Sequence, residues 1–158
     1  MAKVRIRGLV ELEKKLGRTI PDAAKKAAGI AALDGAQEMA ELMYSLAPED
    51  DGDLKRSIEV TGPGGTTPAY SQPGGSRTAG ETEAIITAGN DRVRYPHLVE
   101  FGAAPHLAGG LFEGAQHPGA EAQPFFFPAY RALRRLVQGK ASRAIGRAIR
   151  SAFGKGGR

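Results

Sequence analysis

Apolar side chains recur at three- and four-residue steps between Pro21 and Pro48. This spacing places them on one face of an α-helix. Pro21 suits the first turn of a helix, whereas Pro48 cannot continue one. The pattern therefore predicts one long helix between the two prolines. Its apolar stripe consists of Ile30, Leu33, Met39, Ala40, Met43 and Leu46.

Shorter patterns predict further helices. Leu9, Leu12 and Leu16 fall at helical spacing ahead of Gly17, a natural C-terminal stop. Residues 95–101 predict a short helix. The segment after Pro124 and Pro128 carries a second apolar stripe, flanked by arginines, and predicts a C-terminal helix.

Three segments predict strands: 3–7 and 56–60, which place apolar residues at alternate positions, and 82–88, which contains Ile-Ile-Thr. Together with the helices they predict an α+β fold, in which a small, mostly antiparallel sheet packs against one long helix and a basic amphipathic C-terminal helix. We expect residues 1–137 to form a single α+β domain and residues 138–158 to be a basic helical extension.

Two long glycine-rich loops separate these elements, at residues 62–81 and 102–122. The first contains six glycines and three prolines. Ordering each residue costs roughly 1–2 kcal/mol, which a small domain alone recovers poorly from glycine. Loops this long are usually functional arms or disordered. We favour arms that neighbouring subunits order, with disorder as the alternative.

Composition narrows the class of protein. The apolar fraction of 41% and the charged fraction of 25% are those of an ordinary globular protein. The chain has no cysteine, which excludes disulfides and thiolate metal sites. The first residues alternate charged and apolar side chains, unlike a signal peptide, and no apolar run is long enough to span a bilayer. We expect a protein made in the cytoplasm that does not enter a membrane.

The charge is distributed unevenly along the chain. Residues 122–158 carry nine Lys or Arg and no acid, whereas residues 1–121 carry 13 basic and 17 acidic side chains. A basic tail on a neutral-to-acidic body is suited to a polyanionic neighbour. The C-terminal helix could keep its arginines in solvent, contact DNA phosphates, or lie on a membrane or an acidic partner. The DNA-channel candidates are Arg134, Arg135, Lys140, Arg143, Arg147 and Arg150.

Catalytic patterns are missing from the sequence. Pro63 removes an amide donor from the Gly-Pro-Gly-Gly at 62–65, and no Lys-Ser/Thr follows it, so it is not a phosphate-binding loop. A mixed metal site formed by His97, Glu100, His106 and His117 is conceivable, but the spacing fits no known metalloenzyme motif. We expect no enzyme, no cofactor and no metal.

The aromatic run Phe125-Phe126-Phe127 between two prolines is the most unusual feature. Adjacent side chains point in different directions, so the three rings cannot all enter one core. At least one ring should meet another element or another subunit. A role for the block in the core alone remains the alternative.

Four segments, in order, resemble a known family. They are the alanine-rich helix, Ala47-Pro48 with Gly52, Leu54, Ser57 and Ile58, then Tyr95 with Val99-Glu100-Phe101-Gly102, and Pro124-Phe125 with Pro128-Ala129. This set resembles the tail-component (tail-completion or neck) family of long-tailed bacteriophages, and is similar to lambda minor tail protein Z. The resemblance covers about residues 20–135. Asp51 and Ala103 stand where the family pattern has Thr.

The resemblance implies a structural virion subunit at the head–tail junction, assembled in the bacterial host cytoplasm. It implies a homo-oligomeric ring, with a hexamer as the expected form, around the DNA channel. Its partners would be itself, the tail-terminator, tail-tube or head-closure proteins and, nonspecifically, packaged DNA. Interface candidates are Tyr95, Val99, Glu100, Phe101, Phe125, Phe126 and Phe127. The rival function is a free-standing, nonspecific nucleic-acid-binding protein that uses the basic C-terminal helix.

Overall fold

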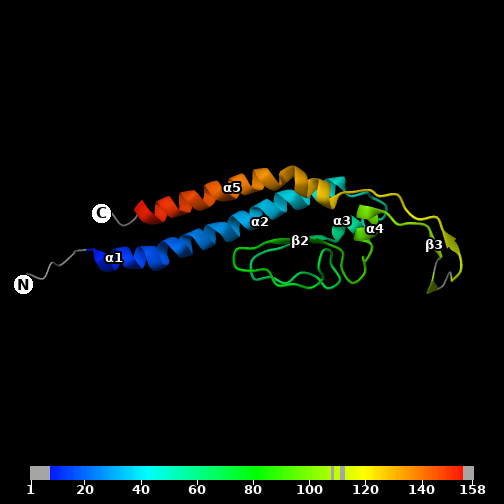
Figure 1. The fold of residues 1–158 in the computed structure, drawn as a ribbon, viewed down its shortest axis with the longest axis horizontal. Coiled ribbons are helices and arrows are strands. Elements are labelled where there is room, and N and C mark those ends of the chain that lie inside the picture. Colours follow the sequence, from blue (N-terminus) through cyan, green and yellow to red (C-terminus); the bar gives the residue numbers. More distant parts are fainter. Residues whose placement is uncertain (1–7, 108, 111–112, 155–158) are drawn as a thin grey trace, which may run out of the picture.

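The computed structural model describes residues 8–107, 109–110 and 113–154. It confirms the predicted α+β class. Two long helices lie side by side, the sheet of β1 and β2 lies beneath one half of the pair, and the β3–β4 segment extends beyond it (Figure 1). In chain order the elements are α1 (Leu9–Lys14), the π-helical segment η1 (Lys15–Thr19), α2 (Ile20–Leu46), α3 (Asp53–Arg56), β1 (Ile58–Thr61), β2 (Ile85–Ala88), α4 (Pro96–Phe101), β3 (His106–Leu107), β4 (Gln116–His117) and α5 (Phe126–Gly154).

The first long helix starts earlier than the sequence predicts. Gly17 does not end a helix, because α1 continues through η1 into α2 without a break. Gly17 lies inside η1, where no described atom lies within 4 Å of the place its Cβ would occupy. The predicted end near Pro48 is correct. Ala47 directly precedes Pro48, is extended with ψ 133° and ends α2.

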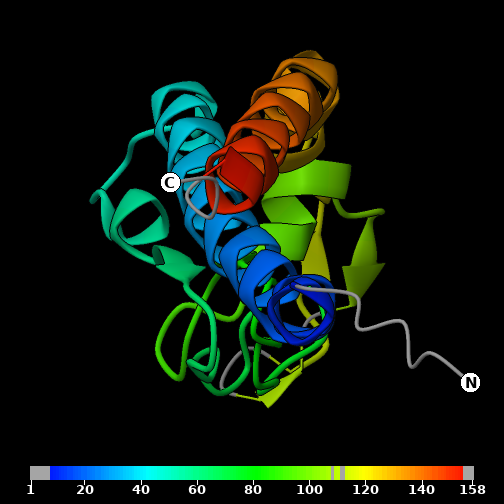
Figure 2. The ribbon, with the colours of Figure 1, turned by 90° about the vertical axis from the view of Figure 1, so that its left-hand side faces the viewer.

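Helices α2 and α5 run antiparallel and in close contact (Figure 2). At Gly35 a Cβ atom would lie 2.2 Å from Cγ1 of Val137, so only glycine permits this approach. Farther along, Lys140 donates to both carboxylate oxygens of Glu38 at 2.6 and 2.8 Å. Helix α5 continues through residues 137 and 138 as one helix. The division of the chain at residue 137 stays a prediction.

The sheet is smaller than predicted. Strands β1 and β2 pair antiparallel, with Glu59 opposite Thr87 and Val60 opposite Ile86. They fall within the predicted strand segments to within about one residue. The third predicted strand, residues 3–7, lies outside the described residues. The loop 62–81 folds back on itself: the amide of Thr67 donates to the Arg77 carbonyl at 2.8 Å, and Gln72 pairs with Ala88 beside β2.

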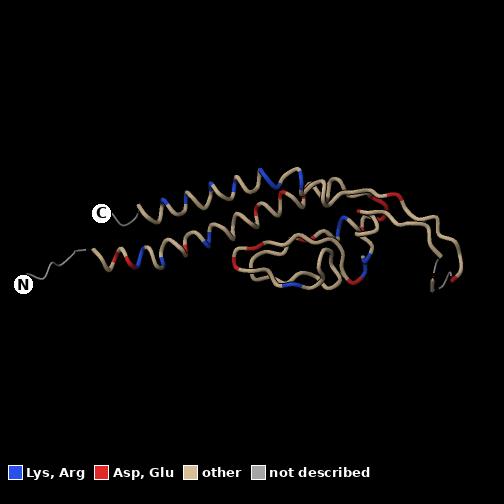
Figure 3. Tube along the Cα trace, viewed as in Figure 1, with Lys and Arg blue, Asp and Glu red and all other residues tan. Residues whose placement is uncertain are grey.

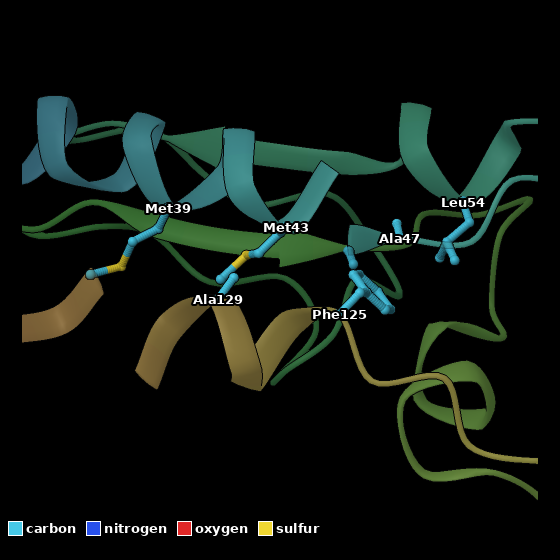
Figure 4. Close-up of a cluster of buried hydrophobic side chains, with 7 residues drawn as sticks. Met39, Met43, Ala47, Leu54, Phe125 and Ala129 are labelled. Carbon is cyan, nitrogen blue, oxygen red and sulfur yellow. The ribbon is translucent and has the colours of Figure 1, made fainter. Parts of the chain in front are cut away.

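The hydrophobic core lies where the two helices meet the sheet (Figure 4). Met43 from α2, Leu54 from α3 and Phe125 before α5 meet there, and Met43 is fully buried. The full cluster is Met39, Met43, Ala47, Leu54, Ala88, Phe125 and Ala129. This cluster lies at one end of the helix pair, and the described residues form no comparable cluster at the other end.

Candidate assembly interface

The Glu100 carboxylate organises the region around the aromatic run. Glu100 is only 6% exposed. Its Oε2 accepts the amides of Phe125 and Phe126, both at 2.8 Å, and its Oε1 accepts the amide of Phe127 at 3.1 Å. These are the free N–H groups at the start of α5, and a carboxylate there also complements the helix dipole. The role of Glu100 within this protomer is therefore to cap α5.

The aromatic run divides its three rings between different surroundings. Phe125 is 1% exposed and belongs to the core. Phe126 is half-buried and packs against the same cluster. Phe127 turns to α4, where its ring centroid lies 5.9 Å from that of Phe101. This division follows from the directions of adjacent residues.

An apolar pocket opens beside these rings. It has a volume of about 110 Å³, and its walls come from α4, the start of α5 and the loop 62–81. Phe101, which is 69% exposed, stands at its rim with Phe127. The pocket is lined by Pro73, Pro96, His97, Phe101, Phe126 and Phe127, among others. An exposed aromatic rim around an apolar hollow is typical of a protein–protein contact.

Tyr95 and Val99 line a second hollow on the other side of α4, together with the acidic turn 49–51. Burial, followed by the nearby charges of Asp51 and Asp53, raises the pKa of the Tyr95 phenol above its usual value. Val99 is half-buried against the core. Tyr95 is therefore the more accessible of the two.

Of the seven predicted interface residues, two have almost no surface to offer in this conformation, namely Glu100 and Phe125. Their contacts are made within the protomer, and they act by positioning their neighbours. Tyr95, Phe101 and Phe127 are exposed, while Val99 and Phe126 are partly so. The interface role of these residues stays a prediction.

The six predicted DNA-channel residues all lie exposed along α5 (Figure 3). Lys140 is bound to Glu38. Within the described part of the chain, the other five form no salt bridge: Arg134, Arg135, Arg143, Arg147 and Arg150. Helix α5 contains no acidic residue, so all of its own charged side chains are basic. Their contact with DNA is untested.

The four residues considered as metal ligands do not come together at one site within the described part of the chain. His106 and His117 face each other across the short β3–β4 pair, with ring centroids 4.9 Å apart. His97 lines the aromatic pocket instead. Among residues 8–107, 109–110 and 113–154, no three His, Asp or Glu side chains are arranged to hold a metal ion.

Sequence reasoning missed an extensive apolar surface at the far end of the helix pair. Leu9, Leu12 and Leu16 fall at helical spacing in the sequence, and all three are exposed. Ile30 of α2 and Phe153 of α5 are exposed at the same end. The lengths of the elements indicate such a surface, because a sheet of short strands cannot cover two helices of 27 and 29 residues.

None of the described helices is long and apolar enough to cross a membrane.

Comparison with known proteins gives one result. No curated protein and no solved structure matches the chain. A family model described as "Bacteriophage HK97-gp10, putative tail-component" matches residues 10–102, from α1 to the glycine that follows α4. The aromatic run and α5 lie beyond the match, and similarity to lambda protein Z stays a prediction. Because the match covers more than half of the sequence, the chain belongs to the HK97-gp10 family of bacteriophage tail components.

Proposed function

We propose that this protein is a non-catalytic structural subunit of the phage head–tail junction, acting in neck formation or tail completion as a ring around the DNA channel. Its family is one of tail components, which supports a structural role in the virion. The observation that carries the proposal further is the large apolar surface left uncovered in a single copy, at the aromatic pocket and at the far end of the helix pair.

Ring closure would use head-to-tail contacts between identical subunits. In such a contact one surface of each copy meets a different surface of the next. The aromatic rim of Phe101 and Phe127 is one candidate surface. The arm formed by β3 and β4, which extends away from the body in Figure 1, is suited to reach a neighbouring subunit or ring.

The basic surface of α5 would line the channel and contact DNA phosphates without reading sequence. No aromatic residue stands among the basic residues between 131 and 152, so stacking on bases is not expected. The same surface is the observation that favours the rival function, a free-standing nucleic-acid-binding protein. That rival predicts tight binding of bare DNA by a monomer or dimer, with log affinity falling against log salt by about 0.9 per phosphate contacted.

Two variants separate assembly from folding. Phe101→Ala removes an exposed ring. We expect it to change the free energy of unfolding by less than about 0.5 kcal/mol and to weaken self-association. Phe125→Ala empties a core position and should lose about 3–5 kcal/mol of stability. Phe126 touches both environments and should show both effects. Thermal unfolding and light scattering measure the two quantities, and unchanged assembly of Phe101→Ala would remove the aromatic rim from the interface.

A further inference from the structure

Helix α1 extends past the end of its partner helix. The antiparallel pair is in contact as far as Lys15, whose Nζ donates to the Phe153 carbonyl at 2.9 Å. Helix α5 ends one residue later, at Gly154. Everything in the first long helix before Lys15 therefore projects beyond α5, as Figure 1 shows.

The projecting segment carries an uncovered row of leucines. Leu9 and Leu12 lie on it, and Leu16 follows just after Lys15, in η1. The three stand three and four positions apart on one helical face, and Leu12 is 45% exposed. None of the six residues of α1 is buried. Because α1 continues the rod of α2, it needs no leucines to stay helical, so an exposed apolar row on it indicates a partner.

A groove that fits such a row lies at the same end of the molecule. It runs between α2 and α5, with Ala23, Ala27 and Ile30 on one side and Ala148 and Ala152 on the other. Small side chains on both walls allow another helix to approach closely, with its larger side chains seated between them. Within one chain α1 cannot reach this groove, because it continues the same helical rod as α2.

The groove is bordered mainly by basic side chains, whereas α1 carries two carboxylates, Glu11 and Glu13, and one lysine, Lys14. Lys26 lines the groove. Arg147 and Arg150 are exposed neighbours of Ala148 on α5. The leucine row is flanked by Glu13, with Glu11 on the same helix. These carboxylates suit a basic groove and oppose contact with DNA or an anionic membrane.

We propose that α1 of one copy docks in the α2–α5 groove of a neighbouring copy, with its leucines on the alanines and Glu13 toward Lys26. This contact rests on the proposed ring function, because it would be one of the contacts that join successive subunits of the ring. The contact is heterologous, because it pairs two different surfaces, so it passes from copy to copy as a ring requires.

Engineered cysteines test this pairing directly, because the natural chain has none. Leu12→Cys and Ala27→Cys are made as separate single variants of the full chain, mixed, and oxidised. Each variant carries a single cysteine, so any disulfide joins two copies. We expect covalent pairs from the mixture and few from either variant alone.

Val10→Cys mixed with Ala27→Cys is the matched control. Val10 is 73% exposed on the same helix but lies off the leucine row, and should cross-link poorly. Equal yields from Val10→Cys and Leu12→Cys, or no covalent pair from the Leu12 mixture, would overturn the proposed contact. Cross-linking of Leu12→Cys to itself would indicate a symmetric pairing of two α1 segments and would also overturn it.

Assembly of polar variants gives an independent reading. Leu12→Asn should weaken self-association about tenfold or more, while Val10→Asn should leave it within about twofold. Both residues are exposed, so neither change should unfold the protein. If the natural protein forms a ring and Leu12→Asn forms it equally well, the proposed α1 contact is contradicted but the proposed ring is not. If natural protein does not self-associate at any concentration, both fail.

Discussion

Glu100 holds the start of α5 through the amide of Phe126 and those of its two neighbours. The next residue, Pro128, has no N–H to satisfy. One carboxylate and one proline thus account for the four amide positions that a helix leaves free at its beginning. The Val-Glu-Phe-Gly and Pro-Phe segments, which resemble a family pattern in sequence, are joined in space by this contact.

We predict that Glu100→Ala lowers the free energy of unfolding by about 2–3 kcal/mol, because three buried amides lose their acceptor. Glu100→Gln keeps one acceptor oxygen and should lose about half as much. Chemical denaturation measures both. Glu41→Ala, an exposed change on α2, is the control and should stay within about 0.5 kcal/mol. Equal stability of Glu100→Ala and Glu41→Ala would contradict the capping role.

Gly35 permits the contact between the long helices. Gly35→Ala should destabilise the protein by about 1–3 kcal/mol, because its Cβ would overlap Val137. Adding Val137→Ala should recover part of that loss, with a coupling energy of at least about 1 kcal/mol in a double-mutant cycle. Gly17→Ala is the control: it has open space in a helix and should stabilise by up to about 1 kcal/mol. Additive effects of the Gly35 and Val137 changes would show that the helices do not touch there.

Thr87 presents a buried hydroxyl without a hydrogen-bond partner among the described residues. Thr87→Val keeps the shape and the β-branch while removing the unpaired polar atom, so we expect it to stabilise the protein by about 1 kcal/mol. The melting temperature should rise accordingly. A fall in melting temperature would mean that the hydroxyl has a partner, such as a water molecule or another subunit.

Lys140 and Glu38 form an exposed pair on the sides of the two helices. Exposed ion pairs contribute little, so Lys140→Gln should change the free energy of unfolding by less than about 1 kcal/mol at moderate salt.

If α5 lines a DNA channel, Lys140→Gln and Arg143→Gln should weaken binding of a short DNA duplex and reduce the salt dependence of that binding. Filter binding at several salt concentrations measures this. Unchanged binding by both variants would separate the basic surface from DNA.

The sequence predicted the elements that carry strong periodicity. The apolar stripe from Ile30 to Leu46 located α2, and the β-branched residues around Ile58 and Ile86 located β1 and β2. It failed at Gly17, because glycine ends a helix only where the chain needs a left-handed residue, and η1 needs none. The capping role of Glu100 was out of reach, since it depends on a contact across 25 residues. The exposure of the α1 leucines was equally hidden, because periodicity shows that a face is apolar without showing what covers it.

The mass of the purified protein in solution tests the central claim most directly. Light scattering at moderate salt is measured over a range of concentrations, alone and with the neighbouring tail-tube or head-closure protein. The ring proposal predicts one defined multiple of the 16.6 kDa chain mass, with only weak binding of bare DNA. A persistent monomer that binds bare DNA tightly would contradict it and favour the nucleic-acid-binding rival.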